Sequence, residues 1–354
     1  MFFQADFSEL LGLKDYMGVM MLITVMETVA PATDRRVRVT EEVFPSRGWE
    51  LRGGVWEAVP GQQGGSRELR RAVIYLHGGG WCLGSSRMEP YDLLARKMVV
   101  ELNAVVISVE YRLAPAHPFP APFEDVYRGV RYFLRDRVLA RFSVDPTRIA
   151  VSGDSAGGNL AAAVAQKLQQ EPGQQVALKA QALLYPVLQA LDLNTPSYRQ
   201  NQDMPILPRT LMVRFWSEYF TSDKTLFRAM MTNSHNRPED AHLLKFVNWS
   251  SHLPESFRGG RAGTAPRAAA AAAAAEDGGL RLLPKAYILT CEYDVLRDDG
   301  VMYATRLRGA GVNVTHRHYA AGFHGALMFT VWPADFQIAH RMTEDYVSWL
   351  RENL

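Results

Sequence analysis

A serine among small residues is the first candidate for chemistry in this sequence of 354 residues. Ser155 lies in the stretch Gly-Asp-Ser-Ala-Gly at 153–157, after a short apolar run and before an alanine-rich one. This is the G-x-S-x-G pattern of a nucleophile on a sharp strand-to-helix turn. Small neighbours permit the turn, and the N–H groups of the following helix face negative charge that develops near the serine. Since glycine and serine are common, an ordinary structural turn also fits the pattern taken alone.

A glycine run supplies the second motif. His77, Gly78, Gly79 and Gly80 follow directly on the apolar stretch AVIYL. Without side chains in the way, backbone N–H groups can point into a cavity, which suits the oxyanion hole of an ester hydrolase. We expect the donors to come from this run, Gly79 and Gly80 most directly, together with the N–H of Ala156.

A nucleophilic serine needs a base, and the expected chain order is serine, acid, histidine. Of the nine histidines, His324 lies in AAGFHGAL, a glycine-flanked loop between the last strand pattern and the last helix pattern. Such a loop can hold an imidazole over the serine, so we predict His324 as the base. The others precede the serine, or fall in the expected cap, a strand pattern or the final helix: His77, His117, His235, His242, His252, His316, His318 and His340.

The acid that orients the histidine is expected at the end of the preceding strand. Asp294, in LTCEYDVLRDDG, follows the apolar run AYIL directly and best matches a strand-end loop. Glu292, Asp298 and Asp299 are rivals, although helix capping explains the last two as well. We predict Asp294 as the acid.

Alternating strands and helices must position these side chains. Apolar β-branched runs predict strands at 71–77, 103–111, 148–153, 177–186, 285–294 and 312–319, and helical patterns occupy 91–102, 123–139, 158–169, 300–310 and 334–351. Continuous apolar strands between helices are typical of a mostly parallel sheet covered on both faces. The fold class is therefore α/β, in a single domain spanning 1–354.

Two regions interrupt the alternation. Residues 1–36 and about 191–257 are expected to form a cap over the carboxyl edge of the sheet, where α/β proteins place their sites. The segment at about 258–283 contains eight consecutive alanines flanked by Gly, Arg and Pro, and it is interpreted as a low-complexity linker.

The longest uncharged apolar run near the N-terminus, 16–26, is shorter than the ~20 residues of a membrane span. It predicts a packed helix or one lying on a membrane surface, not a signal anchor.

The composition excludes several classes of protein. Hydrophobic residues make up 47% and charged residues 21%, and the net charge is +2, so nothing points to nucleic acid. Two cysteines, Cys82 and Cys291, are too few for a disulfide scaffold and the wrong set for a zinc site. Serine chemistry of this kind needs no metal and no organic cofactor, and no protein partner is predicted.

Five motifs together carry a family resemblance: HGGGW, YRLAPAHPFPAPFED, GDSAGG, CEYDVLRDDG and GFHG, in that order from residue 77 to the C-terminus. The chain resembles the hormone-sensitive-lipase branch of the α/β-hydrolases, and within it the arylacetamide deacetylase-like enzymes. The resemblance implies a serine esterase, lipase or deacetylase with the triad Ser155, Asp294 and His324. Its substrates would be apolar acyl esters, amides or lipids. It also implies the α/β-hydrolase fold: a mostly parallel sheet with helices on both faces and a helical cap.

The resemblance further implies a disulfide between Cys82 and Cys291, and with it an oxidising compartment, the endoplasmic reticulum lumen or its membrane. Two buried free thiols are the alternative. The glycosylation sequons at Asn248 and Asn313 are compatible with a lumen but frequent by chance.

A second function remains open at this point: a non-catalytic small-molecule-binding protein on the same scaffold, as in the gibberellin receptors, which lost the catalytic histidine. The presence of His324 in this chain favours an enzyme.

Overall fold

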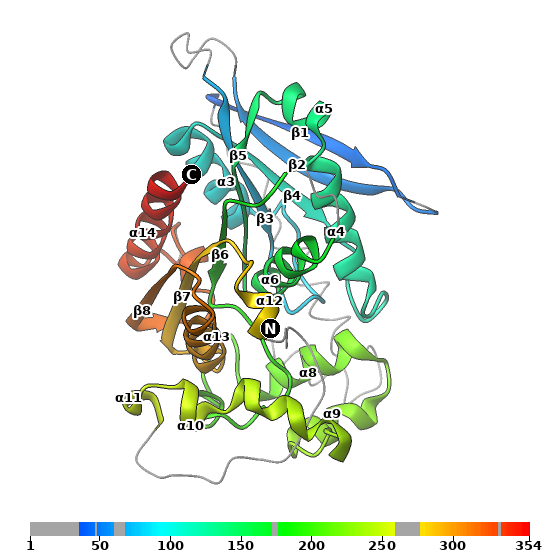
Figure 1. The fold of residues 1–354 in the computed structure, drawn as a ribbon, viewed down its shortest axis with the longest axis vertical. Helices are drawn as coiled ribbons and strands as arrows, with labels where there is room; N and C mark the ends of the chain where they lie inside the picture. Colours follow the sequence, from blue (N-terminus) through cyan, green and yellow to red (C-terminus); the bar gives the residue numbers. More distant parts are fainter. Residues whose placement is uncertain (1–34, 47, 60–67, 172–175, 259–276, 332–333) are drawn as a thin grey trace.

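The computed structural model describes residues 35–46, 48–59, 68–171, 176–258, 277–331 and 334–354. Its centre is an eight-stranded sheet in the order β1-β2-β4-β3-β5-β6-β7-β8 (Figure 1). Strands β3 to β8 pair in parallel, whereas β1 and β2 are antiparallel to each other and β2 to β4. The bounds are β1 Val37–Phe44, β2 Leu51–Ala58, β3 Arg70–Leu76, β4 Ala104–Glu110, β5 Val144–Asp154, β6 Ala180–Leu184, β7 Lys285–Tyr293 and β8 Val314–Phe323.

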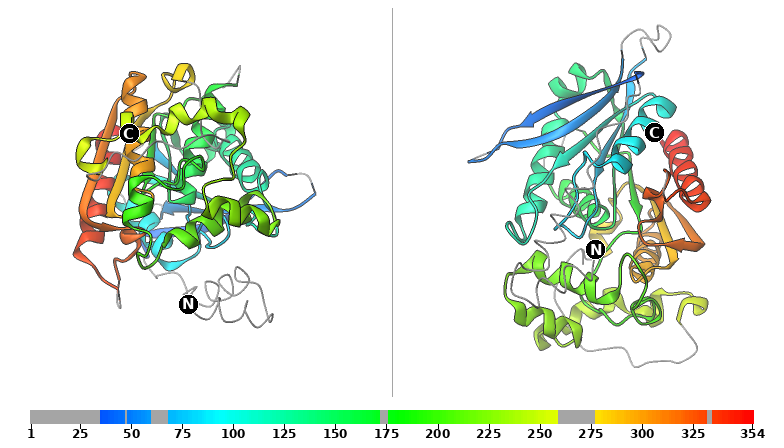
Figure 2. Two further views of the ribbon diagram at one scale, coloured as in Figure 1. Left: turned by 90° about the horizontal axis from the view of Figure 1, so that it is seen from below. Right: turned by 180° about the vertical axis from the view of Figure 1, so that it is seen from behind.

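The six strands expected from apolar runs are all present as β3 to β8, and the predicted mostly parallel α/β sheet is confirmed. The antiparallel pair β1 and β2 was not predicted. Most of β1 is exposed, with Val37 and Phe44 buried at its two ends, so it lacks the continuous apolar run of a strand buried on both faces. Figure 2 shows this blue pair reaching past the rest of the sheet.

Helices cover both faces of the sheet. Side chains alternate along β3, so that Ile74 faces one apolar cluster and Tyr75 the other. The cluster of Tyr75 is closed by α3 (Glu89–Leu102) and α14 (Gln337–Asn353). The cluster of Ile74 is closed by α4 (Ala121–Phe133), α5 (Asp136–Arg141), α6 (Ala156–Gln169) and α13 (Arg297–Gly309). The one helix expected over 123–139 is in fact the pair α4 and α5.

A group of short helices lies beyond the carboxyl end of the parallel strands (Figure 1). We call residues 196–258 the cap segment. It contains α7 (Pro196–Gln200), α8 (Arg209–Phe220), α9 (Lys224–Met231), the 3-10 segment Pro238–Val247, α10 (Trp249–His252) and α11 (Glu255–Arg258). The other expected part of the cap, 1–36, lies almost wholly outside the described residues, as does most of the expected linker; α12 (Asp277–Leu280) follows it. Within the described ranges no helix is long and apolar enough to cross a membrane.

Candidate active site

The turn that carries Ser155 joins β5 to α6 and is sterically strained. Ser155 has φ 53° and ψ −118°, a left-handed conformation that a residue with a side chain rarely adopts. Its N–H donates to the carbonyl oxygen of Leu184 at 2.9 Å, which ties the turn to β6. A Cβ on Gly157 would lie 2.0 Å from the carbonyl oxygen of Leu76, and one on Gly153 would lie 2.5 Å from the backbone of Gly157. The small residues around Ser155 are therefore required by close backbone approach.

Three side chains far apart in the sequence meet at this turn. The Ser155 hydroxyl donates to Nε2 of His324 over 3.0 Å, and Nδ1–H of His324 donates to Oδ2 of Asp294 over 2.8 Å. All three residues are buried. His324 lies in the loop after β8 and Asp294 in the loop after β7, so both come from carboxyl ends of parallel strands. A hydroxyl, an imidazole and a carboxylate are thus in hydrogen-bond contact in series, which is the geometry that a nucleophile, a base and an orienting acid require.

The rival acids have other partners. Glu292 accepts from Arg297 at 2.8 Å and contacts Nε2 of His318 at 3.1 Å. Asp298 accepts from the N–H of Ser197 at 2.7 Å, and Asp299 accepts from the N–H of Leu188 at 3.0 Å. Asp294 is the member of this acidic group that pairs with His324.

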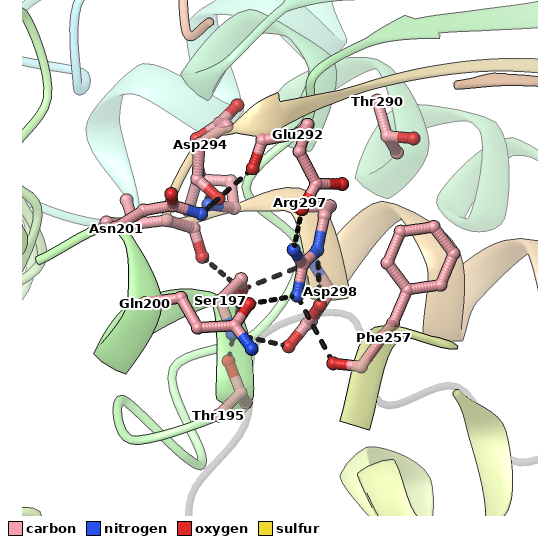
Figure 3. A network of polar contacts seen from close by, with 12 residues as sticks. Thr195, Ser197, Gln200, Asn201, Phe257, Thr290, Glu292, Asp294, Arg297 and Asp298 are labelled. Atoms are coloured by element: carbon pink, nitrogen blue, oxygen red, sulfur yellow. Dashed lines mark hydrogen bonds and ion pairs between the residues drawn. The ribbon is translucent and has the colours of Figure 1, made fainter. Parts of the chain in front are cut away.

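A polar network fixes the loop that bears Asp294 (Figure 3). The side-chain amide of Asn201 donates to the carbonyl oxygens of both Glu292 and Asp294 at 3.0 Å. The guanidinium of Arg297, 2% exposed, donates to Gln200 at 2.8 Å and to Asp298 at 3.0 Å. Because Gln200 and Asn201 belong to α7 and its C-cap, the cap segment and the acid-bearing loop are held as one unit. Gln200, Asn201 and Arg297 were not predicted from the sequence, although Arg297 lies within the motif CEYDVLRDDG.

Tyr185 also contacts the predicted base and was not anticipated. Its ring packs edge-on against the imidazole of His324, with centroids 5.0 Å apart. The residue follows β6 with φ 35°, and its N–H donates to Leu289 at 2.8 Å, which holds this unusual conformation in place. The contact restricts how the imidazole can tilt.

The glycine run forms a loop whose backbone conformation needs glycine at two positions. Gly79 has φ 104° and Gly80 has φ 60°. In the described part of the chain, the N–H groups of Gly79, Gly80 and Ala156 have no hydrogen-bond acceptor. Gly78 differs, because its N–H donates to the Tyr91 hydroxyl at 3.0 Å. Three of the predicted oxyanion positions thus keep an unused donor, whereas Gly78 does not.

His77, the first residue of the predicted oxyanion motif, is buried and packs against an aromatic ring. Its imidazole stacks on Tyr111 with centroids 4.3 Å apart, and its Nδ1 lies 2.9 Å from the carbonyl oxygen of Gly78. The Tyr111 hydroxyl donates to the carbonyl oxygen of His77 at 2.8 Å. Burial lowers the pKa of the His77 imidazole, so the ring is neutral at pH 7.

Aromatic side chains of α8 pack directly on the glycine loop. Trp81, fully buried, stacks on Tyr219 at 4.2 Å between centroids and contacts Trp216 at 4.5 Å. A Cβ on Gly80 would lie 2.2 Å from the ring of Phe215. The position of the loop therefore depends on the cap segment as well as on the sheet.

The predicted disulfide is not formed, and this expectation is corrected: Cys82 and Cys291 are both free and buried. Cys82 packs in the cluster that contains Ile74, whereas Cys291 belongs to the cluster that contains Tyr75. The sheet separates these clusters, because alternate residues of β7 point to opposite faces. Burial raises the pKa of both thiols, so they stay protonated at neutral pH.

Asp154, next to Ser155, is an unexpected buried carboxyl group. It accepts from the hydroxyl of Tyr75 at 3.1 Å and from that of Tyr91 at 3.3 Å. Burial raises the pKa of this carboxyl to about 6, while the two hydroxyls and the neighbouring His324 act in the opposite direction.

Stability should consequently depend on pH through Asp154. The unfolded chain loses this proton near pH 3.8, but the folded protein keeps it until about pH 6. Unfolding between these values releases a proton, so the contribution of this group to the free energy of unfolding falls by about 2–3 kcal/mol as pH rises from 4 to 7. Asp154→Asn removes the titration. Urea unfolding at pH 4 and pH 7 should show the wild type losing that much more stability than the variant over this interval, and parallel losses would contradict the raised pKa.

Among the described residues, no group of three or more His, Cys, Asp or Glu side chains could hold a metal ion.

Comparisons with known proteins place the chain among hydrolases. A family model described as alpha/beta hydrolase fold matches residues 73–247 and 252–328. Arylacetamide deacetylase of Oryctolagus cuniculus is 48% identical, covering 99% of this chain and 89% of the relative. Neutral cholesterol ester hydrolase 1 of Mus musculus is 45% identical, covering 97% and 87%. Among solved structures, an esterase of Pyrobaculum calidifontis has TM-score 0.67 and 28% identity, covering 95% of this chain and 90% of that one. A thermostable esterase of Pseudomonas putida has TM-score 0.70 and 26% identity, covering 96% and 90%.

Proposed function

This chain belongs to the α/β-hydrolase fold family, and we propose that it cleaves carboxylic esters through an acyl-enzyme intermediate on Ser155. Like the relatives named above, it is a carboxylic ester hydrolase. The observation that carries the mechanism is the position of His324, 3.0 Å from the Ser155 hydroxyl on one side and 2.8 Å from Asp294 on the other.

The acylation step uses all three side chains. Nε2 of His324 takes the proton of the Ser155 hydroxyl while the oxygen attacks the acyl carbonyl carbon. Asp294 keeps the remaining imidazole proton on Nδ1, so that Nε2 is free to accept, and its negative charge stabilises the imidazolium that forms. The imidazolium then donates its Nε2 proton to the leaving alkoxide, the carbon–oxygen bond breaks, and the acyl group stays on Ser155.

The carbonyl oxygen becomes negatively charged in this step and needs donors. The unused N–H groups of Gly79, Gly80 and Ala156 are the proposed oxyanion hole. Ala156 is the first residue of α6, where the helix dipole adds to the hydrogen bond. Each such donor is typically responsible for about 10²–10³ in rate. In the second half-reaction His324 takes a proton from water, the hydroxide attacks the acyl carbon, and Ser155 leaves with its proton restored.

We infer that the substrates are apolar acyl esters, together with amides of aromatic amines. The relatives in the comparisons are an arylacetamide deacetylase and a cholesterol ester hydrolase by name. Aromatic residues of α8 and of the neighbouring loop gather beside the glycine run: Trp81, Phe119, Trp216, Tyr219 and Phe220. Phe119, half exposed, packs edge-on against Tyr219 and offers apolar surface for an aryl or acyl group.

A substrate panel tests this inference. Chromogenic esters of increasing acyl length, an N-aryl acetamide, a cholesteryl ester and a triacylglycerol should be offered to the wild type and to Ser155→Ala. We expect wild-type hydrolysis of the short aryl esters and, more slowly, of the acetamide, because an aryl amine is a poorer leaving group than a phenolate. Hydrolysis confined to the triacylglycerol would contradict the aryl preference, and hydrolysis by both proteins would contradict the role of Ser155.

We also propose that the protein resides at the endoplasmic reticulum, as the family resemblance implies. Asn313, in one of the two sequons, is exposed and therefore accessible for glycosylation. Because Cys82 and Cys291 are both free, the expected disulfide no longer supports an oxidising compartment.

A further inference from the structure

The Tyr91 hydroxyl connects the two segments that supply the proposed oxyanion hole. It accepts from the N–H of Gly78 over 3.0 Å and donates to Oδ2 of Asp154 over 3.3 Å. Gly78 directly precedes the loop donors Gly79 and Gly80, and Asp154 directly precedes Ser155. One hydroxyl on α3 therefore reaches both the glycine loop and the nucleophile turn.

This connection begins where the sheet stops holding the two segments together. Strands β3 and β5 pair in parallel as far as Leu76 and Gly153. Two residues beyond Leu76, the N–H of Gly78 donates to the Tyr91 hydroxyl and not to a strand, although the segments stay close: a Cβ on Gly78 would lie 3.0 Å from the carbonyl oxygen of Asp154. The pair of Tyr91 and Asp154 thus continues the link between the segments through side chains.

Asp154 also supports the loop by direct packing. A Cβ on Gly78 would lie only 2.4 Å from Oδ2 of Asp154, so the carboxylate rests against the backbone of this glycine. Its other oxygen accepts from Tyr75 at 3.1 Å. An ionised carboxylate only accepts hydrogen bonds, so Tyr91 must donate to it, which leaves an oxygen lone pair of Tyr91 directed to Gly78. The direction of hydrogen-bond donation is thereby fixed: Gly78 donates to Tyr91, and Tyr91 donates to Asp154.

We propose that Tyr91 and Asp154 are positioning residues that hold the oxyanion loop in register with Ser155. This inference rests on the proposed function, since it concerns the donors that act on the same reaction. Such donors act fully only when they lie within hydrogen-bond distance of the developing oxyanion, and a displacement of about 1 Å can cost on the order of 10²-fold in rate. Because the donors come from both segments, their relative placement decides how well they stabilise one oxygen atom.

The chain offers a matched control for this idea. Tyr75 and Tyr91 are both buried or partly buried tyrosines that donate to the same carboxylate, one to each oxygen. Tyr91 also accepts from the N–H of Gly78 in the loop, whereas the Tyr75 hydroxyl is hydrogen-bonded to Asp154. Replacing either by phenylalanine removes one hydroxyl and keeps the ring, so a difference between the two variants isolates the bond to Gly78.

The experiment measures ester hydrolysis and the affinity for an aryl trifluoromethyl ketone, which forms an oxyanion adduct with a serine nucleophile. For Tyr91→Phe we expect kcat to fall about 10- to 100-fold with KM within about threefold, and ketone affinity to fall in the same proportion. For Tyr75→Phe we expect both quantities to change less than about threefold. Asp154→Asn is a second route to the same loss, because Tyr75 and Tyr91 donate to different carboxylate oxygens and an NH₂ group in place of Oδ2 cannot accept from Tyr91. The double variant Tyr91→Phe/Asp154→Asn should lose no more than the larger single loss.

Several results would overturn the inference. These are a wild-type kcat in Tyr91→Phe, equal losses in the two tyrosine variants, or a fall in kcat with unchanged ketone affinity. Thermal unfolding of each variant shows whether it is folded, and Asp154→Asn provides the test if Tyr91→Phe does not fold. Failure of the proposed function looks different: the wild type itself would neither hydrolyse the ester nor bind the ketone.

Discussion

Replacing Ser155 with alanine should reduce kcat for a chromogenic acyl ester by on the order of 10⁶-fold, because no other group in the site can form the acyl-enzyme. The substitution removes the Ser155 hydroxyl and with it the hydrogen bond to His324. Alanine has the Cβ that Ser155 already places in the strained turn, so the conformation at φ 53° is kept. We also expect this variant to unfold at a temperature close to that of the wild type and to lose labelling by a fluorophosphonate.

Ser152→Ala is the matched control for that experiment. Ser152 is buried in the same strand, where its hydroxyl donates to Ala182 at 2.8 Å and accepts from Tyr346 at 2.8 Å, so it does not take part in the contact with His324. This variant should still react with the fluorophosphonate at Ser155. A wild type that binds apolar esters without turnover and without labelling would instead point to the alternative of a non-catalytic binding protein.

Replacing Asp294 with asparagine should lower kcat by about 10⁴-fold while the loop keeps its shape. Oδ2 of Asp294 accepts the Nδ1 proton of His324 over 2.8 Å, and this contact selects the tautomer whose Nε2 can take the Ser155 proton. An amide NH₂ turned toward Nδ1 would favour the other tautomer, in which Nε2 carries a proton and cannot act as a base. The bond from the Leu296 N–H to Oδ1 of Asp294, 2.8 Å, can persist in the variant.

Glu292→Gln serves as the comparison, since Glu292 is the rival acid two residues earlier. Its carboxylate contacts Arg297 and His318 and lies at the partly exposed edge of the network in Figure 3. We expect its kcat to stay within a few-fold of the wild type. If Glu292→Gln lost more activity than Asp294→Asn in a pre-steady-state assay of acylation, the assignment of the acid would be wrong.

Local patterns in the sequence predicted the elements that carry the chemistry. The apolar runs before the glycine loop, Ser155, Asp294 and His324 are strands β3, β5, β7 and β8, and each candidate lies at or just beyond the strand's carboxyl end. This works because the carboxyl ends of parallel strands lie at one edge of a sheet, so residues that follow different strands converge there. The edge strand β1 escaped prediction because exposure to solvent removes the apolar run that marks a buried strand.

Local sequence patterns were enough to predict that a serine on a tight turn, a glycine loop, an acid and a histidine follow four buried strands, since turn chemistry and strand burial are local properties. The contacts that those residues make are visible only in the folded structure. It placed Cys82 and Cys291 in separate clusters, gave the Gly78 N–H to Tyr91, and joined the acid-bearing loop to α7 through Asn201. Such contacts depend on the face of the sheet to which a side chain points and on which helix packs above it, and both are settled by packing between segments distant in sequence.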